Sequence, residues 1–295
     1  MSDMKIQEGY IDFKGYKTYY RIAGECADGK LPLLALHGGP GCAHDYLESL
    51  DGIAEKYGRA VVYYDQLGCG KSRPEGSHPD LWCAELWEEE LDVVRKALGL
   101  DRIHLLGQSW GGMLAIQYLI NRKPEGVASA IIASSPASIP LWVEEAQRLI
   151  SFMPQDMQDA LAEAARTRDY STPEAQRASA EYYRRHVCSL SPYPDYVSRS
   201  FDQMGESYTL TWGESEYVVT GNLQGWDYSD RLGEIKVPVL VTSGRADEAS
   251  PVISKQLLDN IPDCRWELFP GTHLCHVENK DKYNLTVEQF MSEHE

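Results

Sequence analysis

The chain has 295 residues, of which 43% are hydrophobic, and its 45 acidic residues outnumber 28 lysines and arginines to give a formal net charge of −17. This is the composition of a globular protein with ample material for a core, in one large α/β domain or two smaller ones. An acidic surface repels phosphate, so nucleic acid and anionic membranes are poor candidate partners, whereas a cationic substrate would be tolerated or attracted.

The beginning of the chain and its cysteines favour a cytoplasmic location. Residues 1–8 are polar and lack the apolar core of a signal peptide, and no apolar run is long enough to span a membrane. The seven cysteines are odd in number, scattered and without a C-x-x-C pair, which favours reduced thiols over a disulfide framework. We therefore expect a cytoplasmic protein with no membrane partner.

The apolar pattern along the chain predicts strands that alternate with helices. An antiparallel hairpin is expected around Lys14-Gly15. Continuous apolar runs, typical of buried parallel strands, follow at 33–36, 60–64, 103–106, 127–133, 237–242 and 265–269. Helices are expected at 45–57, 81–98, 113–120 and 282–291. The alternation predicts an α/β fold with a mostly parallel central sheet, helices on both faces, and ligands beyond the carboxyl ends of the strands.

The pattern changes between residues 136 and 220. This stretch has helical periodicity and no buried-strand run, and prolines separate helices that are expected at 141–152, 157–166, 173–187 and 195–204. We interpret residues 136–220 as an all-helical cap domain that is inserted into a core domain made of residues 1–135 and 221–295.

A strand, a sharp turn and a helix meet at Ser109. The apolar run that begins at Ile103 ends in G-Q-S-W-G-G at 107–112, and a helix-compatible run follows at once. G-x-S-x-G between a strand and a helix is the nucleophile elbow of the α/β-hydrolases. Gly107 and Gly111 remove side chains that would collide across the turn. Ser109 is therefore the expected nucleophile, held at a helix N-terminus whose N–H groups favour a developing oxyanion.

The last two expected strands end in candidates for the catalytic acid and base. A serine hydroxyl needs an imidazole that a carboxylate orients, and in this fold the chain order is Ser, Asp or Glu, then His. Asp247 and His273 fit that order, with Glu248 and His276 as the alternatives. We favour Asp247 because it comes first in its turn and is short, and His273 because Gly-Thr places it at the loop apex. A zinc site of His273, Cys275 and His276 lacks a fourth ligand, so we expect no metal and no cofactor.

An oxyanion hole needs two backbone N–H donors. One belongs to the residue after the nucleophile, which is Trp110. The other should come from the H-G-G-P-G loop at 37–41, where glycines allow a close backbone approach. Gly39 is the expected donor, because Pro40 has no N–H.

Three segments resemble the signatures of the proline iminopeptidases: H-G-G-P-G at 37–41, D-Q-L-G-C-G-K-S at 65–72 and G-Q-S-W-G-G at 107–112. These are serine α/β-hydrolases with a helical cap, among them the tricorn-interacting aminopeptidase factor and the bacterial prolyl aminopeptidases, and they release N-terminal residues from short peptides. The likeness runs along nearly the whole chain and is weakest in the cap. It implies the same nucleophile, carboxylate, base and oxyanion donors as the motifs above.

The resemblance also implies two acidic residues that bind the free α-ammonium of the substrate. One directly follows the catalytic aspartate, which makes it Glu248, and the other precedes Thr220-Gly221 and Trp226-Asp227, where Glu216 stands. A desolvated pair of carboxylates distinguishes an N-terminal ammonium from an internal amide, because it is left unpaired when the cation is missing.

The sequence thus predicts a serine aminopeptidase that releases N-terminal proline or a bulky apolar residue from short peptides through an acyl-enzyme. The same triad could act on amino acid amides or small esters, so the expected substrate is a small peptide or amide with a free N-terminus. A third hypothesis is a non-catalytic binding protein with this fold, which has no need for a strained serine turn. The sequence carries no signal for an oligomeric state.

Overall fold

A computed structural model describes residues 4–295 and is built around one eight-stranded sheet in the order β1-β2-β4-β3-β5-β6-β7-β8. The strands are β1 (Ile6–Phe13), β2 (Tyr16–Ala23), β3 (Leu33–Leu36), β4 (Val61–Tyr64), β5 (Ile103–Gln108), β6 (Val127–Ala133), β7 (Val239–Gly244) and β8 (Cys264–Phe269). β2 pairs antiparallel with β1 and β4, and all other neighbours pair in parallel. The expected α/β fold, with its N-terminal hairpin at one edge, is confirmed.

Helices cover both faces of the sheet. One face packs against α2 (Ala84–Ala97), α3 (Trp110–Asn121) and α9 (Pro251–Asn260), and the other packs against α1 (Asp51–Tyr57), α10 (Cys275–Glu278) and α11 (Lys280–Ser292). Successive strand residues point to opposite faces, so Leu34 and Leu36 join the first apolar cluster while Leu33 and Ala35 join the second. Burial on both faces explains why β3 is apolar throughout.

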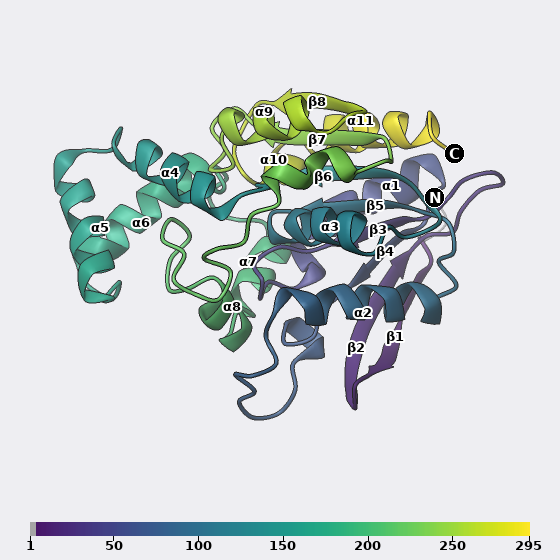
Figure 1. The fold of residues 1–295 in the computed structure, drawn as a ribbon, viewed down its shortest axis with the longest axis horizontal. Helices are drawn as coiled ribbons and strands as arrows, with labels where there is room; N and C mark the ends of the chain where they lie inside the picture. The colour runs from purple at the N-terminus through teal and green to yellow at the C-terminus, as the bar shows by residue number, and fades with distance from the viewer. Residues whose placement is uncertain (1–3) are drawn as a thin grey trace.

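Five helices lie between β6 and β7: α4 (Ile139–Ile150), α5 (Gln155–Thr167), α6 (Pro173–His186), α7 (Asp195–Asp202) and α8 (Glu206–Thr211). Figure 1 shows α4, α5 and α6 projecting beyond one end of the sheet, on the opposite side of the molecule from both termini. They enclose a small core of their own that includes Ile150, Leu161 and Tyr182. Trp142 and Trp212 instead belong to the main core, so α4 and the end of α8 are anchored against the sheet domain.

Three helices were absent from the sequence prediction, namely α8, α9 and the four-residue α10. α8 has six residues and contains two threonines and a tyrosine, which are weak helix formers. α9 carries a recognisable start signal, because the Ser250 side chain accepts the N–H of Val252 and Pro251 occupies the first turn. Three short 3-10 segments complete the fold, η1 (His44–Leu50), η2 (Gly70–Ser72) and η3 (Ser229–Glu234). None of the helices formed by residues 4–295 combines the length and apolar character needed to span a bilayer.

The topology brings the polar motifs of the sequence to one edge of the sheet. The H-G-G-P-G loop follows β3, Ser109 follows β5, Asp247 follows β7 and His273 follows β8. These strands run in parallel, so their carboxyl ends share an edge, and the chain enters α4 from the same end of β6. The inserted helices therefore lie over the edge where these residues meet.

Candidate active site

Ser109 occupies the turn between β5 and α3. Its backbone has φ 56° and ψ −124°, a strained conformation for a residue with a side chain. A Cβ added to Gly107 would lie 2.1 Å from the carbonyl oxygen of Gly111, and one added to Gly111 would lie 2.2 Å from that of Leu36. Neither position can hold a side chain, so the glycines allow the turn that places Ser109 at the start of α3.

Asp247 and His273 are in direct contact. Nδ1 of His273 lies 2.8 Å from Oδ1 of Asp247, and both side chains are buried. The carboxylate is fixed by the N–H groups of Ala249, at 2.8 Å, and Gly244, at 3.1 Å. Because the carboxylate of Asp247 accepts the N–H on Nδ1 of His273, Nε2 of the neutral imidazole is left to accept a proton.

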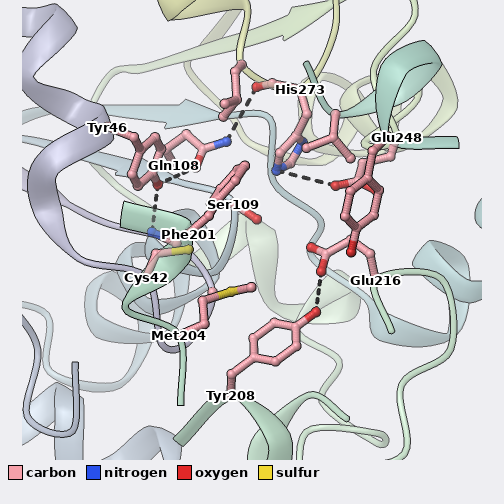
Figure 2. Close-up of a pocket in the computed structure, with 15 residues that line it drawn as sticks. Cys42, Tyr46, Gln108, Ser109, Phe201, Met204, Tyr208, Glu216, Glu248 and His273 are labelled. Atoms are coloured by element: carbon pink, nitrogen blue, oxygen red, sulfur yellow. Dashed lines mark hydrogen bonds and ion pairs between the residues drawn. The ribbon is translucent and has the colours of Figure 1, made fainter. Parts of the chain in front are cut away.

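Ser109 and His273 border one cavity of about 150 Å³. Figure 2 shows the Ser109 side chain below the imidazole, on the side of the ring away from its backbone. No hydrogen bond joins the two side chains within residues 4–295, and Nε2 of His273 lies 3.7 Å from Oε1 of Glu248. Catalytic hydrogen bonds of this kind often form only when substrate is bound.

The alternative histidine, His276, lies in the interior. Its ring packs against Tyr46 and Tyr283, with centroid separations of 5.6 and 5.8 Å, and burial lowers its pKa to about 3. The cavity wall includes His273 and not His276. The structure therefore brings His273 to the carboxylate of Asp247 and leaves His276 as a packed core residue.

Hydrogen bonds orient the loop that follows β3. Nε2 of His37 accepts the N–H of Gln66 at 2.9 Å, so the ring proton is on Nδ1, which donates to the carbonyl of Gly38 at 2.9 Å. The N–H of Gly38 donates to the Tyr46 hydroxyl at 2.7 Å. The C=O and N–H of a trans peptide point in opposite directions, so the bond to the Gly38 carbonyl turns the N–H of Gly39 away from the His37 ring.

The two expected oxyanion donors are both uncommitted. Within residues 4–295 neither the N–H of Gly39 nor that of Trp110 makes a hydrogen bond, whereas the N–H of Gly38 is already used by Tyr46. Gly39 borders the cavity beside Ser109, and its φ of 112° lies in the region that favours glycine. This arrangement leaves Gly39 rather than Gly38 with a free donor near the nucleophile.

Two carboxyl groups face the same cavity. Glu248 is 1% exposed, and within the described residues neither of its carboxyl oxygens has a hydrogen-bond partner. Glu216 accepts a hydrogen bond from the Tyr208 hydroxyl. Burial raises the pKa of both carboxyl groups, and the charge of Glu216 raises the pKa of Glu248 further. A cavity with one buried and one half-buried carboxyl group, the buried one without a hydrogen-bond partner among the described residues, is suited to a cation.

The chain is similar to known proteins over nearly its whole length. Residues 32–280 match the family model of the α/β hydrolase fold. A proline iminopeptidase of Clostridium botulinum is 47% identical, covering 99% of this chain and 100% of its own, and one of Clostridioides difficile is 48% identical, covering 98% and 99%. The crystal structure of the Mycobacterium smegmatis proline iminopeptidase superposes with a TM-score of 0.91 at 36% identity, over 98% of each chain.

The chain belongs to the proline iminopeptidase family of α/β-hydrolases. The resemblance seen in the H-G-G-P-G, D-Q-L-G-C-G-K-S and G-Q-S-W-G-G segments is thereby confirmed.

In this member of the proline iminopeptidase family, the end of α6 holds the loops that carry the site. The carbonyl of His186 accepts the N–H groups of Glu248, at 3.2 Å, and His273, at 3.0 Å. The next carbonyl, of Val187, accepts the hydroxyl of Thr272 at 2.9 Å. Sequence reasoning missed these contacts, because backbone carbonyls carry no residue-specific signal.

Sequence reasoning also missed several side chains in the cavity wall of this family member. Tyr46 comes from η1, Phe201 from α7 and Met204 from the turn before α8. Apolar and aromatic residues at helical spacing look the same in sequence whether they face a core or a ligand, so no pattern distinguishes these three.

Proposed function

We propose that this protein is a serine aminopeptidase that releases an N-terminal proline or bulky apolar residue from short peptides. The observation that carries the proposal is the buried carboxyl of Glu248, which has no hydrogen-bond partner among residues 4–295 and faces the same cavity as Ser109 and His273. A carboxylate in that position is stabilised when a substrate ammonium enters. The same ammonium fixes the adjacent carbonyl, the first in the peptide, near the serine.

The proposed reaction proceeds through an acyl-enzyme. Ser109 attacks the first carbonyl while Nε2 of His273 takes its proton, and Asp247 stabilises the resulting imidazolium. The N–H groups of Gly39 and Trp110 bind the oxyanion. His273 then gives the proton to the leaving amine, and water, activated by the same imidazole, hydrolyses the ester.

The rest of the cavity supports the proposed choice of residue. Glu216 and Glu248 would bind the ammonium, and the side chain of the first residue would lie among apolar groups. Those that border the cavity are Cys42, Val187, Phe201, Met204 and Leu274. A proline ring or a bulky aliphatic side chain is suited to such a lining, since its burial contributes about 25 cal/mol per Å².

We further propose that residues 136–220 act as a cap over a core made of residues 1–135 and 221–295. The helices α4–α8 and their contacts with the loops of Asp247 and His273 support this division. We also propose a cytoplasmic location, for which the support is that all seven cysteines lie among the described residues as free thiols. The proposed chemistry uses side chains and backbone groups of the chain without a cofactor.

The first prediction tests the nucleophile with L-prolyl-β-naphthylamide and a fluorophosphonate probe. The protein should hydrolyse the amide and be labelled by the probe, and Ser109→Ala should lose labelling and at least about 10⁴-fold of kcat, because the acyl-enzyme can no longer form. Persistent labelling or turnover in Ser109→Ala, with circular dichroism showing an intact fold, would contradict the proposal.

A further inference from the structure

The buried hydroxyl of Tyr46 connects separate parts of the candidate active site. It accepts the N–H of Gly38 at 2.7 Å and donates to Oε1 of Gln108. Nε2 of Gln108 in turn donates to the backbone carbonyl of His273 at 3.4 Å. Figure 2 shows this chain of hydrogen bonds running behind Ser109. One hydroxyl and one amide thus join the loop after β3, the nucleophile turn and the loop of the base.

Each hydrogen bond in this chain has only one possible direction. A backbone N–H can only donate, so the Tyr46 oxygen accepts from Gly38 and its own proton goes to Gln108. With its carbonyl oxygen turned to Tyr46, the Gln108 amide presents its NH₂ to the carbonyl of His273. A flipped amide would set two carbonyl oxygens against each other, so the three bonds select a single arrangement.

The bond to Gly38 bears directly on the oxyanion hole. It fixes the peptide plane between His37 and Gly38, and the His37 ring fixes the next plane through the Gly38 carbonyl. Gly38 has no side chain to restrain this segment, and one would be crowded there, since a Cβ would lie 3.0 Å from the Cβ of Ser109. The direction of the Gly39 N–H therefore depends on hydrogen bonds to the loop rather than on packing.

We propose that Tyr46 is a positioning residue for the transition state. Its hydroxyl holds the Gly39 N–H toward the acyl oxygen and, through Gln108, holds the His273 loop in register with Ser109. This rests on the proposed function for the roles of Gly39 and His273. Glu216 and Glu248 do not take part in the chain, so the proposed binding of the substrate ammonium does not depend on it.

The test compares Tyr46→Phe with a matched control, Tyr283→Phe. Both tyrosines are buried, both pack against the ring of His276, and each substitution removes one buried hydroxyl. The Tyr283 hydroxyl bonds to Oγ1 of Thr242 at 2.9 Å, away from the oxyanion loop. A purely structural role would lower the stability of both variants and leave kcat alike in both.

We expect Tyr46→Phe to lose about 10- to 100-fold in kcat with KM within about twofold of wild type, less than the loss of an oxyanion donor itself. Tyr283→Phe should keep kcat within about twofold of wild type. Its melting temperature should fall by about as much as that of Tyr46→Phe. Wild-type kcat in Tyr46→Phe, or equal kcat losses in both variants, would overturn the proposal.

A second substrate separates this proposal from the proposed function. p-Nitrophenyl acetate has no amine, yet its hydrolysis by a serine hydrolase needs the same oxyanion donors and base. If the wild-type protein hydrolyses the ester but no aminoacyl amide, the aminopeptidase proposal fails, and the kcat of Tyr46→Phe on the ester still tests Tyr46. A ten-fold or greater loss there supports the positioning role, and wild-type ester turnover refutes it.

Discussion

Glu248 illustrates how a single side chain can be costly for stability and still suit a binding site. Its carboxyl is buried with no hydrogen-bond partner among the described residues. Burial, followed by the charges of Glu216 and Asp247, raises the pKa of this carboxyl well above the ordinary value. The charged form is therefore disfavoured in the folded protein without a ligand. A substrate ammonium would offset that penalty, which is why discrimination against substrates without a free amine is expected to be strong.

The corresponding stability prediction concerns Glu248→Gln. A folded pKa above the unfolded value contributes stability that is complete at low pH and is lost as pH rises through the folded pKa. The wild-type protein should therefore lose stability above the ordinary glutamate range, and the glutamine variant should not. We expect the free energy of unfolding of Glu248→Gln to exceed that of wild type by about 1–3 kcal/mol at pH 8, with a correspondingly higher melting temperature. Near pH 4 the two proteins should differ little.

Thermal unfolding followed by circular dichroism at the two pH values measures this difference. A glutamine variant that melts below wild type at pH 8 would show that Glu248 is paired in the free protein.

At the residue scale, the sequence could predict the parts that local chemistry defines. Ser109 follows from its motif, and Asp247 and His273 follow from chain order at the ends of strands. In the sequence, His273 was favoured over His276 because of its position in the loop. In the structure, His273 is distinguished by its contact with Asp247. The sequence could not predict that the carboxyl oxygens of Glu248 lack a hydrogen-bond partner among the described residues, because such pairing depends on residues from distant elements.

At the scale of elements, the end of α6 links the inserted helices to the loops of the acid and base. Two consecutive carbonyls, of His186 and Val187, accept backbone and side-chain donors from those loops. The sequence predicted α6 well, because Thr172 and Pro173 mark its start. The central strands β3 and β4 were predictable for a different reason, since burial on both faces makes them continuously apolar.

Thr272→Val tests this link between α6 and the base. Valine keeps the shape of threonine but removes the hydroxyl, which lies 2.9 Å from both the Val187 carbonyl and Oε1 of Glu278, while the Val187 carbonyl still accepts the N–H of Leu274 at 2.9 Å. We expect a loss of about 1–2 kcal/mol in stability and a several-fold fall in kcat, because the adjacent His273 loses support. Thr272→Ser retains the hydroxyl and should keep most of the wild-type stability and kcat.

Denaturant unfolding and steady-state kinetics with L-prolyl-β-naphthylamide measure the two effects. If Thr272→Val and Thr272→Ser behave alike, the hydroxyl contact does not support the base loop.

At the scale of the whole molecule, the sheet and the inserted helices together define what can reach Ser109. The cavity of about 150 Å³ lies between the carboxyl edge of the sheet and residues of α6, α7 and α8. Its size suits the end of a short peptide rather than a folded chain. The sequence predicted this architecture from the alternation of strands and helices. Which residues of the inserted helices face the cavity depends on how those helices dock, and no periodicity records that.

The central claim is that carboxyl groups in the cavity select substrates by their free N-terminus. The most direct test compares kcat/KM for L-prolyl-β-naphthylamide and its N-acetyl derivative, in the wild-type protein and in Glu248→Gln. We predict a preference for the free amine of at least about 100-fold in wild type, reduced tenfold or more in the variant because the ammonium loses its partner. Equal turnover of the free and acetylated substrates by the wild-type protein would contradict the account.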